Sequence, residues 1–128
     1  MPSPSGPFSD TVRPLALAAL LGVAGVAHLA RPGNFDQIIP QRLPGSPRAY
    51  TYVSGVVELA LAVALLRPGS RRLAGVATAL FFAAVFPANV KMAVDVLASP
   101  RAGTGRKAAV LLRLPLQVPL IRAALRVR

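Results

Sequence analysis

The stretch Ala49–Leu66, AYTYVSGVVELALAVALL, decides how the rest of the chain is interpreted. It is apolar along its length apart from Glu58 near its centre. An ionised carboxylate in hydrocarbon is costly, so Glu58 needs a polar partner or a water-filled cavity. Ser54, Gly55, Glu58 and Ala62 share one helical face, and small residues there let a second helix approach closely. The stretch predicts a membrane-spanning helix with this face turned towards protein.

The composition limits the fold and the chemistry. A chain of 128 residues allows one domain, and its 54% hydrophobic content, with a mean hydropathy of +0.56, is gathered into blocks. The sequence contains no cysteine, which excludes thiol redox chemistry, disulfides and thiolate metal sites. Its single histidine excludes a bis-His haem within one chain. These features favour an all-α fold, a four-helix transmembrane bundle.

The formal net charge of +11 first raises the question of nucleic-acid binding. Basic residues instead flank the apolar blocks, where cations extend towards lipid headgroups. No basic face remains once the blocks are removed, so the expected partner is the lipid bilayer and not a nucleic acid. The flanking residues are Arg13, Arg31, Arg48, Arg67, Arg71, Arg72, Arg106, Lys107 and Arg126.

Four apolar blocks are expected to span the membrane. Each has about 18 residues, which gives a helix of ~27 Å against a hydrocarbon core of ~30 Å. A soluble bundle of such helices would have no polar outer face. Residues 1–10 are expected to form a disordered tail, and residues 11–128 a single membrane domain. The spans are predicted at Thr11–Ala30, Ala49–Leu66, Leu73–Val90, with an extension towards Leu97, and Ala108–Leu125.

Two segments of the sequence are each compatible with a second structural interpretation. The first span also resembles a signal peptide, with Arg13 before the apolar run Leu15–Val26 and a small-x-small site at Gly25–Ala27. The loop Pro32–Arg48 is predicted to carry a short interfacial helix, with Asn34 as its cap and Pro40 at its end. Phe35, Ile38 and Ile39 would share one face of that helix, although an irregular loop is almost equally compatible with the sequence.

Four spans place both termini on one side of the membrane, here named side A, with side B opposite. His28, Asn89 and Lys91 then lie close to side B, at the ends of the first and third spans. Arg113 lies ~8 Å deep from side B, and Glu58 and Gln117 lie ~14 Å deep, near the midplane. The polar residues therefore lie in the B half or at the midplane. The predicted pocket residues are His28, Glu58, Asn89, Arg113 and Gln117, beneath the Pro32–Arg48 loop.

Glu58 is the acid whose partner matters most. Arg113 and Gln117 share a helical face, so Glu58 with Arg113 is the first predicted pair, and Glu58 with Lys91 is the second. Such a pair could shape a ligand pocket or only fix helix register. His28 could contact a quinone or relay a proton, or simply be a hydrogen-bonded residue near the span end.

Two further residues of the cluster have structural alternatives. Asn89 could satisfy a carbonyl freed by Pro87 instead of contacting a ligand. Lys91 is more typical of a cation extending to the headgroups than of a ligand-binding residue. His28 and Glu58 alone are too few ligands for a metal site, so no metal is predicted.

Orientation rests on basic residues, which are almost evenly divided between the two sides. The connection Arg67–Arg72, RPGSRR, is the densest basic loop, and short loops carry most weight in orientation. Side A is therefore expected to be cytoplasmic, in a multi-pass protein of the cell membrane with both termini inside.

Four stretches in order carry a resemblance: GVAHLARPGNFDQIIPQRLPG from Gly25, YTYVSGVVELALAVALLRPGSRR from Tyr50, FPANVKMA from Phe86 and LRLPLQVPLI from Leu112. Together they resemble the DoxX family of small bacterial membrane proteins over about residues 20–123. The resemblance implies a four-helix membrane bundle and a redox association, since one branch is a subunit of a thiosulfate:quinone oxidoreductase. The family's recurring polar positions map onto His28, Pro40, Glu58, Pro87, Asn89, Arg113, Pro115 and Gln117.

Three function classes follow. The first is a membrane subunit of a redox complex with protein partners, for which quinone is the candidate cofactor and a sulfur compound a candidate ligand. The second is a small-molecule transporter or binder, and the third is a structural membrane anchor for partner proteins. No cofactor motif indicates an autonomous enzyme, and no pair of broken-helix repeats indicates a carrier.

Overall fold

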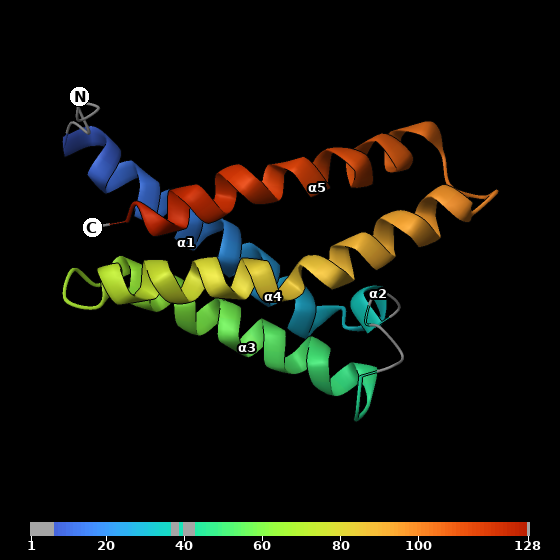
Figure 1. Cartoon of the computed structure of the whole chain (residues 1–128). Helices are drawn as coiled ribbons and strands as arrows, with labels where there is room; N and C mark the ends of the chain where they lie inside the picture. Colours follow the sequence, from blue (N-terminus) through green and yellow to red (C-terminus); the bar gives the residue numbers. More distant parts are fainter. Residues whose placement is uncertain (1–6, 37–38, 40–42, 128) are drawn as a thin grey trace.

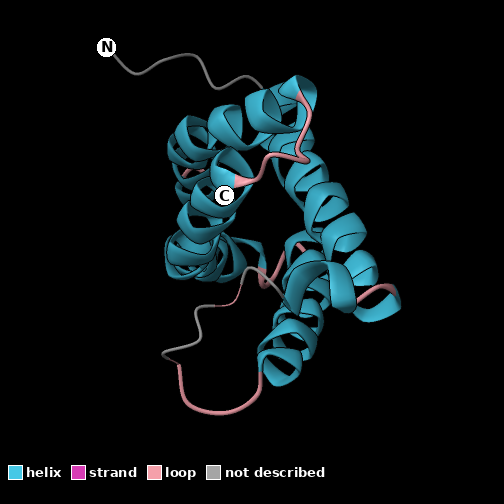
Figure 2. Cartoon of the chain, turned by 90° about the vertical axis from the view of Figure 1, so that its right-hand side faces the viewer, coloured by secondary structure: helices cyan, strands magenta, loops and turns pink. Residues whose placement is uncertain are grey.

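The computed structural model describes residues 7–36, 39 and 43–127 of the chain (Figure 1). All regular structure in these residues is helical, which confirms the predicted all-α bundle with four long apolar helices (Figure 2). The helices are α1 (Pro7–Ala30), α2 (Gly33–Asp36), α3 (Pro47–Leu66), α4 (Arg71–Ala98) and α5 (Thr104–Leu125).

Helices α1, α3, α4 and α5 are each long and apolar enough to cross a membrane, which indicates a multi-pass membrane protein. Their outward faces carry large apolar side chains, such as Val23, Leu73 and Leu80, of which at least two thirds is exposed. A soluble protein rarely exposes such faces, whereas lipid tails cover them without penalty.

The helix ends extend beyond the apolar blocks. Residues Pro7–Asp10, predicted as disordered, form the first turn of α1, while residues 1–6 lie outside the described part of the chain. Helix α3 begins at Pro47, a residue suited to the first helical position, and Ser46 Oγ accepts a hydrogen bond from the Ala49 N–H at 3.2 Å. Helix α5 begins four residues before its apolar block.

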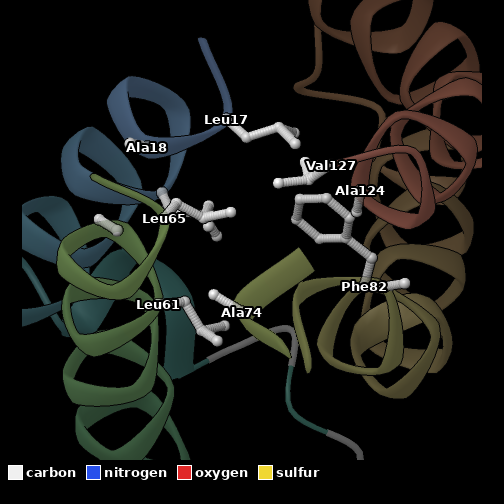
Figure 3. Close-up of a cluster of buried hydrophobic side chains, with 11 residues drawn as sticks. Leu17, Ala18, Leu61, Leu65, Ala74, Phe82, Ala124 and Val127 are labelled. Atoms are coloured by element: carbon white, nitrogen blue, oxygen red, sulfur yellow. The ribbon is translucent and has the colours of Figure 1, made fainter. Parts of the chain in front are cut away.

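The long helices form two antiparallel pairs, α1 with α3 and α4 with α5, which contact each other less than the partners within each pair do (Figure 1). The pairs join at the end that holds both termini, side A. An apolar core there takes Leu17 from α1, Leu65 from α3, Phe82 from α4 and Ala124 from α5 (Figure 3). Towards side B the α4–α5 hairpin separates from α1 and α3, so the polar residues lie where the two pairs diverge.

The α3–α4 turn is closed by side-chain hydrogen bonds to the last carbonyls of α3. Ser70 Oγ donates to the Ala64 carbonyl at 2.9 Å, and Arg71 Nε donates to the Leu65 carbonyl at 3.0 Å. The last four carbonyls of a helix have no partner within it, so these bonds satisfy groups that would otherwise face lipid. The predicted tight connection is confirmed, but it is shorter than the predicted Arg67–Arg72, because α4 already begins at Arg71.

Glycines set the closest approaches within each pair. A Cβ on Gly25 of α1 would lie 2.9 Å from the Gly55 carbonyl oxygen, and one on Gly55 would lie 3.0 Å from His28 Cβ. A Cβ on Gly75 of α4 would lie 2.5 Å from the Ala124 carbonyl oxygen of α5. Only glycine allows the backbones this close. The small-residue face predicted on the second span is therefore the face that α1 contacts.

Candidate functional site

A polar pocket of about 60 Å³ lies between the two helix pairs, next to α2. It contains four of the five predicted pocket residues, namely His28, Glu58, Asn89 and Arg113. The fifth, Gln117, contacts Asn89 from the adjoining core. The remaining lining residues are Phe35, Ile39, Thr51, Ser54, Val85 and Ala88.

His28 and Glu58 form an ion pair inside this pocket. His28 Nδ1 lies 2.8 Å from Glu58 Oε2, and the glutamate is 6% exposed. The predicted first pair, Glu58 with Arg113, is wrong: the acid meets the histidine of α1, and no ion pair joins it to Arg113 in the described chain. The predicted second pair is also wrong, because Lys91 Nζ lies 2.7 Å from Asp95 Oδ2 on its own helix.

The Gly25–Gly55 crossing explains why His28 is the partner. Each ionisable residue lies three positions beyond its glycine, so the two α-carbons are offset along antiparallel helices by ~9 Å in total. Helical side chains lean towards the N-terminus of their helix. His28 therefore leans towards side A and Glu58 towards side B, and the two side chains meet between their α-carbons.

The position of a proton on His28 follows from its neighbours. Nδ1 lies 2.7 Å from the Ala24 carbonyl oxygen and 2.8 Å from Glu58 Oε2, and both of these atoms accept hydrogen bonds. Nδ1 therefore carries a proton, which leaves Nε2 as the nitrogen that can gain or lose one. One proton serves two acceptors, and its direction towards Ala24 leaves Glu58 Oε2 without a well-aligned hydrogen bond. The carboxylate is thus poorly satisfied for a buried group.

Arg113 brings a positive charge to the same pocket without being used by the fold. Its side chain is exposed, and it forms no hydrogen bond or ion pair with any residue in the described ranges. A guanidinium offers five N–H donors in a planar fork suited to oxyanions. Arg113 is therefore the pocket group that is free to bind something else.

Asn89 and Gln117 mainly hold helices together through hydrogen bonds. Asn89 Nδ2 donates to Gln117 Oε1 at 3.2 Å, and Gln117 Nε2 donates to the Phe82 carbonyl at 2.5 Å, with both side chains buried. Pro87 removes one backbone donor from this part of α4. The predicted alternative, in which Asn89 satisfies the carbonyl freed by Pro87, is wrong. Asn89 Nδ2 donates to Gln117, and the carbonyl that Gln117 satisfies is that of Phe82, one residue before the Ala83 carbonyl that Pro87 leaves without its helical donor. These two residues fix α4 against α5.

Helix α2 covers the histidine. The Phe35 ring lies 4.0 Å from the His28 ring, centroid to centroid, at 30°. Asp36 accepts hydrogen bonds from Thr51 Oγ1 at 2.7 Å and from Arg48 Nε at 2.8 Å, which ties α2 to the start of α3. The sequence placed Phe35 on a loop helix but did not indicate the roles of Asp36 and Thr51.

The predicted short helix in the first loop is confirmed as α2, but its predicted cap and extent are wrong, since α2 ends at Asp36 and the predicted face residue Ile39 lies beyond it. Helix α2 begins at Gly33, so Asn34 is its second residue. The predicted face residue Ile38 and the predicted end at Pro40 lie outside the described residues.

The link between α2 and α3 should weaken in acid. The Thr51 hydroxyl, and then the Arg48 guanidinium, lower the pKa of Asp36 below its ordinary 3.8. A carboxyl with a lowered pKa in the folded state stabilises the fold above its unfolded pKa, and this contribution is lost as pH falls through the lowered value. Wild type should therefore be more thermally stable than Asp36→Asn at pH 7. The difference should begin to shrink as the pH falls below 3.8 and disappear once the pH is below the lowered pKa of Asp36. A pH-independent difference would contradict this assignment.

Comparison with known proteins identifies one family. A family model described as a domain of unknown function, DUF8561, matches residues 17–128 and so includes every residue of the pocket. No curated protein and no solved structure matches the chain.

Proposed function

We propose that this chain, which belongs to the DUF8561 family, is a membrane subunit of a redox assembly whose pocket binds a small oxyanion. The observation that carries the proposal is the free Arg113 guanidinium beside the buried His28–Glu58 pair. Ionisable residues inside membrane segments are candidates for function by default, and here the Glu58 carboxylate already has a partner in His28. Arg113 supplies the attraction for a ligand.

The charges of the pocket favour an anion that arrives together with a proton. With His28 neutral, Arg113 and Glu58 balance, and an added anion would leave an excess negative charge in a region of low dielectric. Protonation of His28 Nε2 removes that excess. His28 thus couples anion binding to proton uptake, while Glu58 holds the imidazole in place.

Pocket size favours a sulfur oxyanion over a quinone ring. A volume of about 60 Å³ corresponds to about two water molecules at their liquid volume of ~30 Å³ each. Pockets for drug-sized ligands are ~300–1,000 Å³. A small oxyanion such as sulfite is of the size of this pocket, whereas a quinone would place only a carbonyl edge against Arg113. The resemblance to the DoxX family supports the same sulfur chemistry.

A small-molecule binder or transporter outside any redox complex is the second candidate, favoured by the same pocket. A purely structural anchor fits less well, because register alone does not require a free guanidinium. Isolation of the protein in mild detergent separates the first two: a redox subunit retains oxidoreductase partners, and a solitary binder does not.

Side A is proposed to be cytoplasmic in the cell membrane, as the arginines of the α3–α4 turn favour. Reporter fusions at both termini should then report the cytoplasm. Fusions that report opposite sides would contradict the four-span topology, and two external termini would reverse only the orientation.

Replacing Arg113 should weaken anion binding without unfolding the protein. In lipid nanodiscs, Arg113→Gln should weaken sulfite or thiosulfate binding by about tenfold or more, because a charge-assisted hydrogen bond is lost. Arg106→Gln, an exposed position on the same helix outside the pocket, is the matched control. Isothermal titration in two buffers of different ionisation enthalpy measures affinity and proton uptake together. Equal anion affinity in wild type and Arg113→Gln would refute the proposal.

A further inference from the structure

We infer a second site, independent of the pocket, that binds an anionic phospholipid at the side A end of the α3–α4 groove. The groove has a volume of about 310 Å³ and is lined almost entirely by apolar side chains, including Ala60 and Ala64 of α3 and Leu73 and Ala77 of α4. It ends at Ser70, in the turn between the two helices.

The end of the groove carries three arginines close to Ser70. Arg67 and Arg72 are exposed and form no hydrogen bond or ion pair with any residue that the structure describes. Arg71 is half-buried and donates from Nε to the Leu65 carbonyl, which holds its guanidinium at the turn. Of the four acidic residues in the chain, only Asp10 belongs to the side A half of a span. This end therefore has a net positive charge.

An apolar groove that ends at a cluster of cations is complementary to a molecule with a long apolar tail and an anionic head. Basic pockets at the ends of transmembrane helices bind such lipids. Small alanine side chains leave room for an acyl chain along the helices, and arginine forks suit a phosphate. A free phosphate would use the arginines alone, whereas a phosphatidylglycerol molecule uses both the arginines and the groove.

The test compares lipids in purified protein held in neutral detergent. Dioleoyl phosphatidylglycerol should bind and raise the melting temperature, whereas dioleoyl phosphatidylcholine and inorganic phosphate should have little effect. Native mass spectrometry counts the retained lipids. Neutralising two arginines, Arg67→Gln with Arg72→Gln, should weaken phosphatidylglycerol binding by about thirtyfold, at the strength expected of two cations near a membrane surface. The matched control is Arg101→Gln with Arg106→Gln at the far turn.

The groove requires its own variants. Ala60→Phe places a ring in the groove at an exposed position and should displace the acyl chain, while Val63→Phe, exposed on the same helix but outside the groove, should not. Equal stabilisation by phosphatidylglycerol and inorganic phosphate would overturn the lipid assignment. So would unchanged phosphatidylglycerol affinity in either Ala60→Phe or the double arginine variant, since both variants alter only exposed side chains.

Discussion

Replacing His28 with leucine should lower the free energy of unfolding by about 3 kcal/mol, the lower end of the range for breaking a buried ion pair. The reason is that the Glu58 carboxyl remains in the variant without its partner. Glu58 is 6% exposed, and the imidazole is the only ion-pair partner it has in the described chain. Without His28 the carboxyl must either stay charged in a poor solvent or take up a proton. Reversible denaturation in mixed micelles measures the change.

Replacing Glu58 with leucine should cost much less, no more than about 1 kcal/mol. His28 can be neutral, and its Nδ1–H still has the Ala24 carbonyl as an acceptor at 2.7 Å. The double variant should resemble Glu58→Leu alone and not the sum of the two single changes. A Glu58→Leu loss as large as that of His28→Leu would contradict this one-sided dependence. Arg113→Leu is the control for the pairing expected from sequence, and it should leave stability nearly unchanged.

The fold was predictable because hydropathy is a property of whole segments. Four blocks of apolar residues predict four spans without any knowledge of side-chain contacts. The ends of the helices were harder to place, because polar residues extend a helix without belonging to an apolar block. Residues Pro7–Asp10 and Thr104–Lys107 are helical for this reason, although the former were predicted as a tail and the fourth span was predicted to begin only at Ala108.

The residues that line the pocket were predictable, but the ion pair between His28 and Glu58 was not. Depth along the spans brought His28, Glu58, Asn89 and Arg113 to one region, and the structure places all four on one pocket. Arg113 was preferred over His28 as the partner of Glu58 on the basis of α-carbon depths and formal charges alone. Side chains on antiparallel helices lean in opposite directions, so two side chains can meet although their α-carbons lie at different depths. The crossing at Gly25 and Gly55 sets that offset.

The residues that cover the pocket left weaker signals. Asp36 and Thr51 lie 15 positions apart and meet only because the first loop folds back over the start of α3. Neither is one of the recurring polar positions of the family resemblance, and no local pattern in the sequence joins them. Phe35 was recognisable as an apolar loop residue, but its contact with the His28 ring depends on the same loop geometry.

Gly25→Ala should reduce stability and ligand binding together. The added Cβ would lie 2.9 Å from the Gly55 carbonyl oxygen and 2.9 Å from Leu59 Cγ, so α1 and α3 must move apart. Overpacking of this kind costs about 1–3 kcal/mol. Gly22→Ala is the matched control, since its Cβ would meet nothing within 4 Å, and alanine's higher helix propensity should make it neutral or up to ~1 kcal/mol more stable.

The same variant tests whether the crossing positions the ion pair. When α1 and α3 separate, His28 and Glu58 move apart, and each loses the contact that the other provides. His28→Leu should therefore cost about 3 kcal/mol in the wild-type background but clearly less in the Gly25→Ala background, whereas the Gly22→Ala background should keep the full cost. An unchanged cost in all three backgrounds would mean that the pair forms without the close glycine contact. The expected dependence links two glycines, which have no side-chain chemistry of their own, to the chemistry of the pocket.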